Sequence, residues 1–370
     1  MRVLIETQPN DIHADAVHWA LKKHGVEVAV HLGCEFPLHT QISVRADGAR
    51  SPALETSIRT EQGILVDADK APDVVWNRRP AWPELGDDLH PADKAYAARE
   101  TYALLAGARE AMQSRARVLH ARETRIFAND KLCQLDAARR AGFQIPLTLA
   151  TNDSQSARAF WHECHQRVIF KPFHSAQWGL GKAAAHLNTT RLTGSHFEGE
   201  MIEGIRQGPG IFQEEVPKRS ELRVTVIGGR CYALRIFSQE QTLTEVDWRC
   251  DATLSRTRSE ATRLAGEVEA KCLETCANLG LQFGCIDLVE RPDGEVVFLE
   301  VNEMGQFLWV EESAPKIELL RAFAACLVDE SPECMRSDVS FEFFLQAGQP
   351  SCTASRISVA LPFRTVEIPA

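Results

Sequence analysis

Short apolar runs alternate with an amphipathic stretch at the start of the chain. Residues 2–5 and 26–32 are apolar runs, and residues 14–24 between them repeat apolar positions at helical spacing. Gly25 follows the helical stretch, where a glycine commonly ends a helix. The pattern therefore predicts a strand, a helix and a second strand, which is the opening of an open α/β domain.

The section that follows is less regular. Residues 43–51 and 60–68 have the alternation and turn residues of a hairpin. Residues 73–80 predict a strand that ends at a proline, because proline has no amide hydrogen to offer to a sheet. Residues 91–113 are rich in Ala, Leu and Glu, and we expect a helix there.

A new unit is predicted to begin near Ile126. Residues 129–146 form an amphipathic helix that Gly142 closes, and residues 146–152 form a strand. Two more strands are predicted at residues 167–173 and 210–216, and a glycine-containing loop at 174–182 follows the first of them. Together these elements complete a small α+β subdomain.

Beyond Pro217 the pattern predicts a second α+β subdomain. A hairpin turns at Gly228 and Gly229, and a long helix covers residues 260–279. Two strands follow, at 283–294 and 295–303, with Pro292, Asp293 and Gly294 in the turn between them. From Ser337 onward we expect added strands.

These elements combine the α/β and α+β classes in one chain. The predicted parts are an N-terminal open α/β domain, a central subdomain, a C-terminal subdomain and an extension, at residues 1–125, 126–216, 217–336 and 337–370.

Composition narrows the function classes. The 370 residues carry 51 Asp and Glu against 41 Lys and Arg, a net charge of −10, which argues against a nucleic-acid-binding or anionic-membrane-binding surface. No apolar run approaches a membrane span and no secretory signal is evident, so we expect a cytoplasmic protein. The 11 cysteines are odd in number and scattered, which favours ordinary thiols. An anionic substrate would require local cations.

Two strands carry the most informative polar residues. On the strand 295–303, Glu300 and Asn302 share one face while Val301 points into the core, and Asp287 lies on the preceding strand. Two carboxylates and an amide oxygen suit Mg²⁺, which commonly binds nucleotide phosphates. The alternative is that these are solvated strand residues.

A lysine near a glycine-containing loop suggests a phosphate site. Lys171 ends an apolar strand, and the loop after it contains Gly179, Gly181 and Lys182. Taken alone, a surface lysine and a plain turn explain this stretch equally well.

The segment between the two subdomains is a candidate for adenine binding. The backbone of Gln213, Glu214, Glu215 and Val216 has the position to read the adenine edge, and Glu215 or Lys218 to reach the ribose or the ring. A simple connecting strand is the alternative. Arg223, on the next strand, would place a guanidinium near a phosphate or carboxylate.

Arg78 and Arg79 are adjacent at a strand end. Alternation sends them to opposite faces, so one is expected to be structural and the other is a candidate contact for an acidic peptide.

The order of these segments resembles the ATP-grasp ligases. The resemblance rests on NDKLCQLDAARRAGFQIPLT, IFKPF, GIFQEEVPK, ELRVTVIGG, FGCIDLV and FLEVNEMGQFLWVEE. More narrowly, VVWNRRP, PLTLATND, the DxR element Asp247-Trp248-Arg249 and GQFLW resemble the graspetide synthetases, peptide maturases that form microviridin-type side-chain crosslinks. The resemblance covers roughly residues 1–325 and implies an ATP-grasp fold, in which two α+β subdomains clasp ATP.

The resemblance also implies a role for each matching residue. Asp287, Glu300 and Asn302 match the magnesium ligands, and Arg249 of the DxR element matches the arginine that holds the substrate carboxylate or its phosphate. Lys131 and Lys171 match the two nucleotide-contacting lysines, and Gln213, Glu214, Glu215 and Val216 match the adenine hinge. Glu221 and Arg223 match the ElR element. Asp247 and Arg235 are candidates to assist Arg249.

The implied reaction is ATP-dependent activation of Asp or Glu side chains in a precursor peptide with a leader and a core. A Ser or Thr hydroxyl or a Lys amine then forms an ester or amide crosslink, with the glycine loop from Ser175 to Lys182 as a lid. The resemblance implies a homodimer. A ligase acting on a small molecule or a protein terminus and a non-catalytic ATP-binding module are the alternatives. Where many relatives have Asn-Pro, this chain has Asn302-Glu303-Met304-Gly305.

Overall fold

The computed structural model describes residues 1–46, 54–173, 177–180, 183–186, 189–251, 256–355 and 364–365. They form two compact units. The first takes Met1–Arg125, Ile227–Gly229 and Met304–Val359, and the second takes Ile126–Val226, Arg230–Glu303 and Ala360–Ala370.

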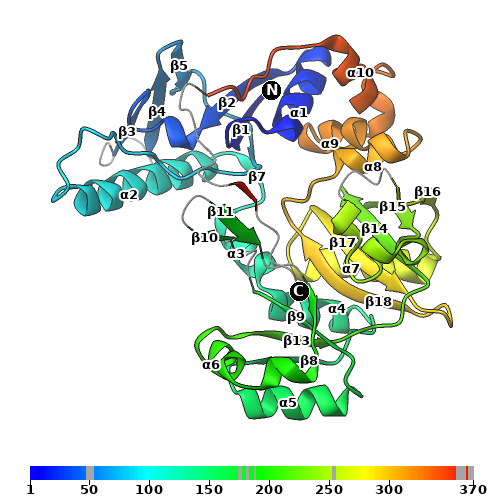
Figure 1. Cartoon of the computed structure of the whole chain (residues 1–370). Coiled ribbons are helices and arrows are strands. Elements are labelled where there is room, and N and C mark those ends of the chain that lie inside the picture. The colour runs from blue at the N-terminus through cyan, green and yellow to red at the C-terminus, as the bar shows by residue number, and fades with distance from the viewer. Residues whose placement is uncertain are drawn as a thin grey trace. The chain divides into compact units, whose positions relative to one another are not determined.

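A parallel sheet forms the centre of the first unit (Figure 1). Its strand order is β2-β1-β6-β7, with β1 Arg2–Thr7, β2 Glu27–Leu32, β6 Val74–Asn77 and β7 Arg117–Leu119. Helix α1 (Ile12–Lys23) joins β1 to β2 and begins at Asp11, whose carboxylate accepts bonds from the amides of His13 and Ala14. The predicted strand-helix-strand opening is confirmed.

A second, antiparallel sheet in the same unit differs from the predicted hairpin. It has three strands, β3 Thr40–Arg45, β4 Glu55–Thr60 and β5 Gly63–Val66. The tight hairpin joins β4 to β5, while residues 47–53 between β3 and β4 lie outside the described part of the chain. The long helix α2 (Lys94–Gln113) packs against β3 and β4 and buries Leu105, Ala108 and Met112 in their core.

The last part of the chain adds helices to this unit. They are α8 Leu308–Ser313, α9 Leu319–Leu327 and α10 Phe341–Ala347. Residues 304–336, which the sequence analysis places in the C-terminal subdomain, lie in the first unit because the apolar α9 packs against α1. The expected strands after Ser337 are wrong for the first element, since Ser340 caps a helix and Phe341 and Phe344 bury one face of it.

Arg78 is the structural member of the arginine pair. Its side chain is only 1% exposed, and its Nε donates to Asp11 Oδ2 at 3.1 Å. Its Nη1 also donates to the carbonyl oxygen of Gly305 at 3.2 Å. These bonds hold Arg78 inside its unit, and the half-buried Arg79 stays the candidate contact for a peptide.

The second unit contains two larger sheets that flank the site. The first has the order β12-β9-β13-β8, with β8 Thr148–Thr151, β9 Val168–Lys171, β12 Thr190–Arg191 and β13 Gly210–Glu214. Around it lie α5 Ser154–Glu163 and α6 Glu200–Gln207, and α3 Arg122–Asn129 and α4 Lys131–Arg140 precede it in the chain. A small third sheet pairs β10 Gln177–Leu180, β11 Ala183–His186 and β19 Arg364–Thr365.

The second of these sheets has the order β16-β15-β14-β17-β18. Its strands are β14 Ser220–Ile227, β15 Arg230–Ile236, β16 Ser259–Thr262, β17 Phe283–Glu290 and β18 Val296–Asn302, and helix α7 is Gly266–Asn278. Gly228 and Gly229 have φ of +53° and +79°, which confirms the predicted turn. The predicted helix at 260–279 is too long, because residues 259–262 extend the sheet by pairing with β15.

Two further expectations concern the whole chain. All 11 cysteines are free thiols, as expected. Among the residues that the structure describes, no helix is both long and apolar enough to cross a bilayer.

Candidate active site

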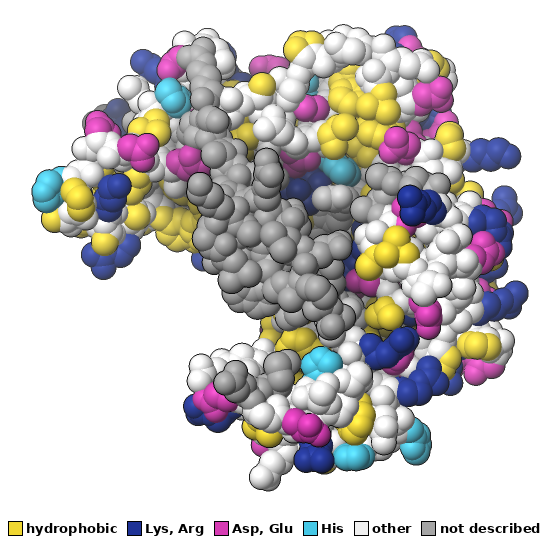
Figure 2. Space-filling model, in the orientation of Figure 1, with side chains coloured by type: hydrophobic (Ala, Val, Ile, Leu, Met, Phe, Trp, Pro, Cys, Tyr) yellow, Lys and Arg dark blue, Asp and Glu magenta, His cyan; other side chains and the backbone are white. Residues whose placement is uncertain are grey.

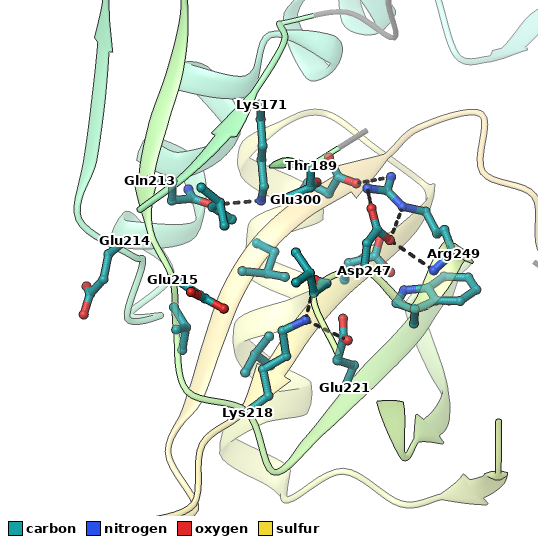
Figure 3. A pocket seen from close by; sticks show the side chains of 17 residues that line it. Lys171, Thr189, Gln213, Glu214, Glu215, Lys218, Glu221, Asp247, Arg249 and Glu300 are labelled. Atoms are coloured by element: carbon teal, nitrogen blue, oxygen red, sulfur yellow. Dashed lines mark hydrogen bonds and ion pairs between the residues drawn. The ribbon is translucent and has the colours of Figure 1, made fainter. Parts of the chain in front are cut away.

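A pocket in the second unit collects most of the predicted site residues (Figure 3). Strand β9, the hinge after β13, the loop 246–249 and strands β14, β17 and β18 all contribute to it. Its apolar walls come from Ile169, Val216, Val246, Val289 and Leu299. Apolar walls of this kind are suited to a flat purine ring.

A β-bulge explains one wall residue that the sequence analysis missed. The register of β17 and β18 pairs Asp287 with Glu300 and Leu288 with Phe298, which leaves Leu299 as the extra residue. Both Leu299 and Glu300 therefore line the pocket, although strict alternation would send Leu299 to the opposite face. Thr189 and Trp248 also line the pocket; Trp248 lies inside the DxR element, but neither had a distinct sequence signal.

The three predicted metal ligands lie together. Asp287 and Glu300 face each other across the two paired strands, and Asn302 Nδ2 donates to Asp287 Oδ2 at 3.2 Å. Val301 is 1% exposed and points into the core, as predicted. The donor set is two carboxylates and one amide oxygen, which fits Mg²⁺. The described residues contain no group of three or more His, Cys, Asp or Glu suited to a metal, so this set depends on the Asn302 amide as its third member.

The two carboxylates have opposite pKa shifts. Burial raises the pKa of Asp287 and the charge of Glu300 adds to this, against the pull of Arg223. Burial also acts on Glu300, but Arg249, Lys131 and Lys171 outweigh it and hold the pKa of that carboxyl below its usual value. A second positive charge near Asp287 would therefore be favourable, which a bound divalent cation supplies.

Arg249 reaches the metal carboxylates. Its Nε and Nη2 donate to the Asp247 carboxylate at 2.8 and 2.7 Å, and its Nη1 donates to Glu300 Oε1 at 3.4 Å. In Figure 3 the three side chains point toward one another. The DxR aspartate thus orients the arginine, in the bidentate geometry that favours Arg over Lys.

Arg223 and Arg235 have different positions. Arg223 is 5% exposed and donates two bonds to Asp287, at 2.8 and 3.0 Å, so it lies directly behind the metal pair. Arg235 lies on β15 and pairs with Glu290 at 3.4 Å, and it does not line the pocket. The structure therefore brings Arg223 to the site and leaves Arg235 outside it.

The two lysines approach the site from different elements. Lys171 Nζ donates to Gln213 Oε1 at 2.8 Å, and the Lys131 ammonium lies 3.7 Å from Glu300 Oε2. Burial lowers the pKa of Lys171 to about 8, although the charge of Glu300 opposes the shift. Gln213 also donates to Thr148, so its side chain is a fixed support for Lys171.

The two glutamates of the hinge, Glu214 and Glu215, have different surroundings. Figure 3 shows the Glu214 carboxylate pointing away from Lys171 and Arg249, and Glu215 takes two bonds from Arg191 Nε at 3.0 and 3.2 Å. Lys218 donates to Glu221 at 3.0 Å and to the carbonyl of Val246 at 2.7 Å.

Burial also raises the pKa of Glu221, and the Lys218 ammonium opposes that shift. The Lys218 ammonium is thus engaged by the loop that carries Arg249 rather than free for a ribose. Residues 175–176 and 181–182 of the predicted lid lie outside the described chain, and residues 177–180, which the sequence analysis places in a loop, form strand β10 paired with β11.

Charged side chains of both signs are interspersed on the face shown in Figure 2, over the part that β14–β18 build. The local concentration of cations is instead within the pocket, where Lys171 and Arg249 face the carboxylates.

Comparison with known proteins shows which of them the chain is similar to. No protein-family model and no curated protein matches the chain. Among solved structures, a RiPP-associated ATP-grasp ligase of Chryseobacterium gregarium, in complex with ADP and a leader and core peptide, has a TM-score of 0.80 and 26% identity. The match covers 89% of this chain and 96% of that one.

Two macrocyclases of Microcystis aeruginosa are also similar. MdnB has a TM-score of 0.72 and 29% identity, over 88% of this chain and 99% of its own. MdnC, bound with precursor peptide MdnA, has a TM-score of 0.77 and 23% identity, over 89% and 99%, and shows the shared fold. These likenesses confirm the predicted resemblance, and the chain is an ATP-grasp carboxylate ligase similar to the macrocyclases of the graspetide branch.

Proposed function

We propose that the chain is an ATP-dependent peptide ligase that crosslinks side chains of a ribosomal precursor peptide. The observation that carries the proposal is the position of Arg249, which lies between Asp247 and Glu300 in a pocket that also contains Lys171. A guanidinium there is placed to hold a substrate carboxylate beside the terminal phosphate of a nucleotide.

The first step forms an acyl phosphate. An oxygen of an Asp or Glu side chain attacks the γ-phosphorus of ATP, the bond to the β,γ-bridging oxygen breaks, and ADP leaves. Lys131 and Lys171 would orient the phosphates, and Arg249 would hold the attacking carboxylate. Asp287, Glu300 and Asn302 would hold Mg²⁺, which neutralises charge on the phosphate oxygens when it is bound.

The second step forms the crosslink. A Ser or Thr hydroxyl, or a Lys amine, attacks the activated carbonyl and loses its proton, and inorganic phosphate leaves. Arg223 and Arg249 would stabilise the departing phosphate. The acyl phosphate must be kept from water, and the segment from Ser175 to Lys182, of which β10 is the described part, is the proposed lid.

The proposal extends to partners. Solved relatives contain a leader and core peptide or a precursor peptide, so we propose an acidic precursor peptide with both parts as the substrate. We also propose a homodimer, on the family resemblance. A cytoplasmic location is proposed because ATP is the co-substrate and the thiols of the chain are free.

Intact mass of a peptide measures the proposed reaction. The protein is incubated with ATP, Mg²⁺ and an acidic precursor peptide rich in Thr and Glu or Asp, ideally one encoded beside the gene. Each crosslink removes one water, so we expect the peptide to lose that mass in whole steps while ADP and phosphate appear. Glu300→Gln should abolish both.

The alternatives give distinct outcomes. An unchanged peptide together with ATP turnover on an added small amine would favour a small-molecule ligase. ATP binding without any ADP release, across a panel of such peptides and amines, would instead indicate a binding module.

A further inference from the structure

Strand β18, which carries Glu300 and Asn302, is the last strand of its sheet. An edge strand presents backbone amides and carbonyls with no strand beside them, and such groups need partners when they are buried. Gln144 bridges to Val297 on this edge, and its carbonyl accepts from the Phe298 amide. Further along the strand the neighbour is helix α4, which contacts β18 (Figure 1).

One side chain of α4 takes the place of the missing strand. Gln134 Nε2 donates to the Val301 carbonyl at 2.8 Å, and Gln134 Oε1 accepts from the Val301 amide at 3.1 Å. The same Nε2 donates to the Ala128 carbonyl at 2.6 Å, and the side chain is 4% exposed. A primary amide has the same donor and acceptor as a peptide group, so Gln134 pairs with Val301 as a strand residue would.

The residues on either side of Val301 are held from the same helical region. The Lys131 ammonium lies 3.7 Å from Glu300 Oε2, and Asn129 Nδ2 donates to Glu303 Oε1 at 2.6 Å. The Asp130 carboxylate caps α4 by accepting from the amides of Leu132 and Cys133. Residues 129–134 therefore contact Glu300 and Val301 of β18 and Glu303, which follows the strand.

We propose that Gln134, assisted by Asn129, is a positioning residue for the metal site. It fixes the backbone at Val301 and so the direction in which Glu300 and Asn302 project. The inference rests on the proposed function, because it takes these two residues as ligands of Mg²⁺. Partners of metal ligands commonly change metal affinity by about 10- to 100-fold when they are removed.

The chain offers a matched control. Asn278 on α7 donates its side-chain amide to the Ala137 carbonyl, a bond to the same helix α4 at 3.2 Å, without touching β18. Gln134→Met keeps the length of the side chain and removes its bonds, and Asn278→Ala removes the control bond. Both variants lose a buried or half-buried polar contact of α4.

The experiment measures Mn²⁺ affinity in the presence of ADP, with Mn²⁺ as the probe, and hydrogen exchange at the Val301 amide. Gln134→Met should weaken Mn²⁺ binding by about tenfold or more and speed Val301 exchange. Asn278→Ala should leave both within about twofold of the parent, a limit set well below that effect. If Gln134→Met does not fold, Asn129→Ala takes its place as the test variant, because Asn129 is exposed. This variant should also weaken Mn²⁺ binding.

Three results would separate the possibilities. Unchanged Mn²⁺ affinity in Gln134→Met overturns the proposal, whether or not Val301 exchanges faster. An equal loss in Asn278→Ala also overturns it, since that indicates general loosening of α4. A parent protein that binds no Mn²⁺ with ADP refutes the proposed function, whereas Val301 exchange still decides whether Gln134 holds the strand.

Discussion

At the scale of single residues, the site depends on cations that already have carboxylate partners. Arg249 is bound to Asp247 and Glu300, Arg223 to Asp287, and Lys131 lies beside Glu300. Lys171 differs, because its ammonium donates to the neutral amide of Gln213. Anionic substrates must therefore exchange places with internal carboxylates at Arg249, but not at Lys171.

Lys171 predicts a pH dependence of nucleotide binding. Burial lowers its pKa from 10.5 to about 8, so the free protein loses this charge as the pH rises through about 8. We expect the affinity for ADP, measured by calorimetry, to fall over that range. Lys171→Arg stays charged and should show a flatter profile; an identical decline in that variant would assign the effect to another group.

The lowered pKa of Lys171 also makes the free energy of unfolding depend on pH. Between about pH 8 and 10.5 the unfolded chain holds a proton on this lysine that the folded chain has lost. The unfolded state then binds more protons, so the contribution of Lys171 to the free energy of unfolding increases with pH in this window.

Arg249→Ala should separate ligation from nucleotide binding. Because the guanidinium is proposed to hold the substrate carboxylate, we expect kcat/KM for the peptide to fall by about 100-fold, or about 2.7 kcal/mol. ADP affinity should change by less than about threefold, which is under 0.7 kcal/mol. Arg258→Ala, which removes an exposed partner of Glu240, is the control. Equal losses of ADP and peptide binding would contradict a substrate role.

The positions of these site residues could be predicted from the sequence better than the residues that they contact. Alternation along β18 is enough to place Glu300 and Asn302 on one face. The bond from Lys218 to Val246 and the pair of Arg191 with Glu215 join residues distant in sequence, and no local pattern encodes them. Arg235 shows the converse, since a strand position near the site in sequence lies outside it in space.

At the scale of elements, the junction of α3 and α4 contributes several residues that contact β18 and the residue after it. A single turn of helix carries Lys131 and Gln134, and its start depends on the Asp130 cap. The helix and its glycine end are predicted correctly, since both follow from local pattern. The β-bulge that turns Leu299 into the pocket was missed, because a bulge depends on the pairing of two strands.

Asp130→Ala should weaken the site as well as the helix. Loss of an aspartate cap costs about 1 kcal/mol of stability. Asp153 caps α5 by accepting from the amides of Gln155 and Ser156, together with the Ser156 hydroxyl, and is the control. We expect both alanine variants to lower Tm by similar amounts, but only Asp130→Ala to reduce ADP affinity. Reduced ADP affinity in both would indicate a general effect of lost stability.

At the scale of the whole molecule, the chain has two units with separate apolar cores. One core includes Leu4, Val75 and Leu105 in the first unit, and another includes Leu135, Ile286 and Phe298 in the second. The linear plan of consecutive domains fails at residue 304, because sequence pattern shows that a helix is apolar without showing which earlier helix it will cover.

Ligand binding should stabilise the two units unequally. The pocket lies in the second unit, so ADP with Mg²⁺ at about 100 times its Kd should add about 2.7 kcal/mol to the stability of that unit. Differential scanning calorimetry should then show one transition moving to higher temperature while the other stays. A single transition that shifts as a whole would show that the units unfold together.

The discontinuous make-up of the first unit limits how the gene can be divided. Its three stretches are separated by residues 126–226 and 230–303 of the second unit, and α9 from the last stretch packs on α1 from the first. A fragment that ends at Arg125 would lack α8, α9 and α10 and would expose the apolar side of α1 to water. A gene split there divides the first unit between its two halves, while the second half keeps every stretch of the second unit. Truncation at Arg125 would therefore report misfolding of the first unit rather than the role of the removed part.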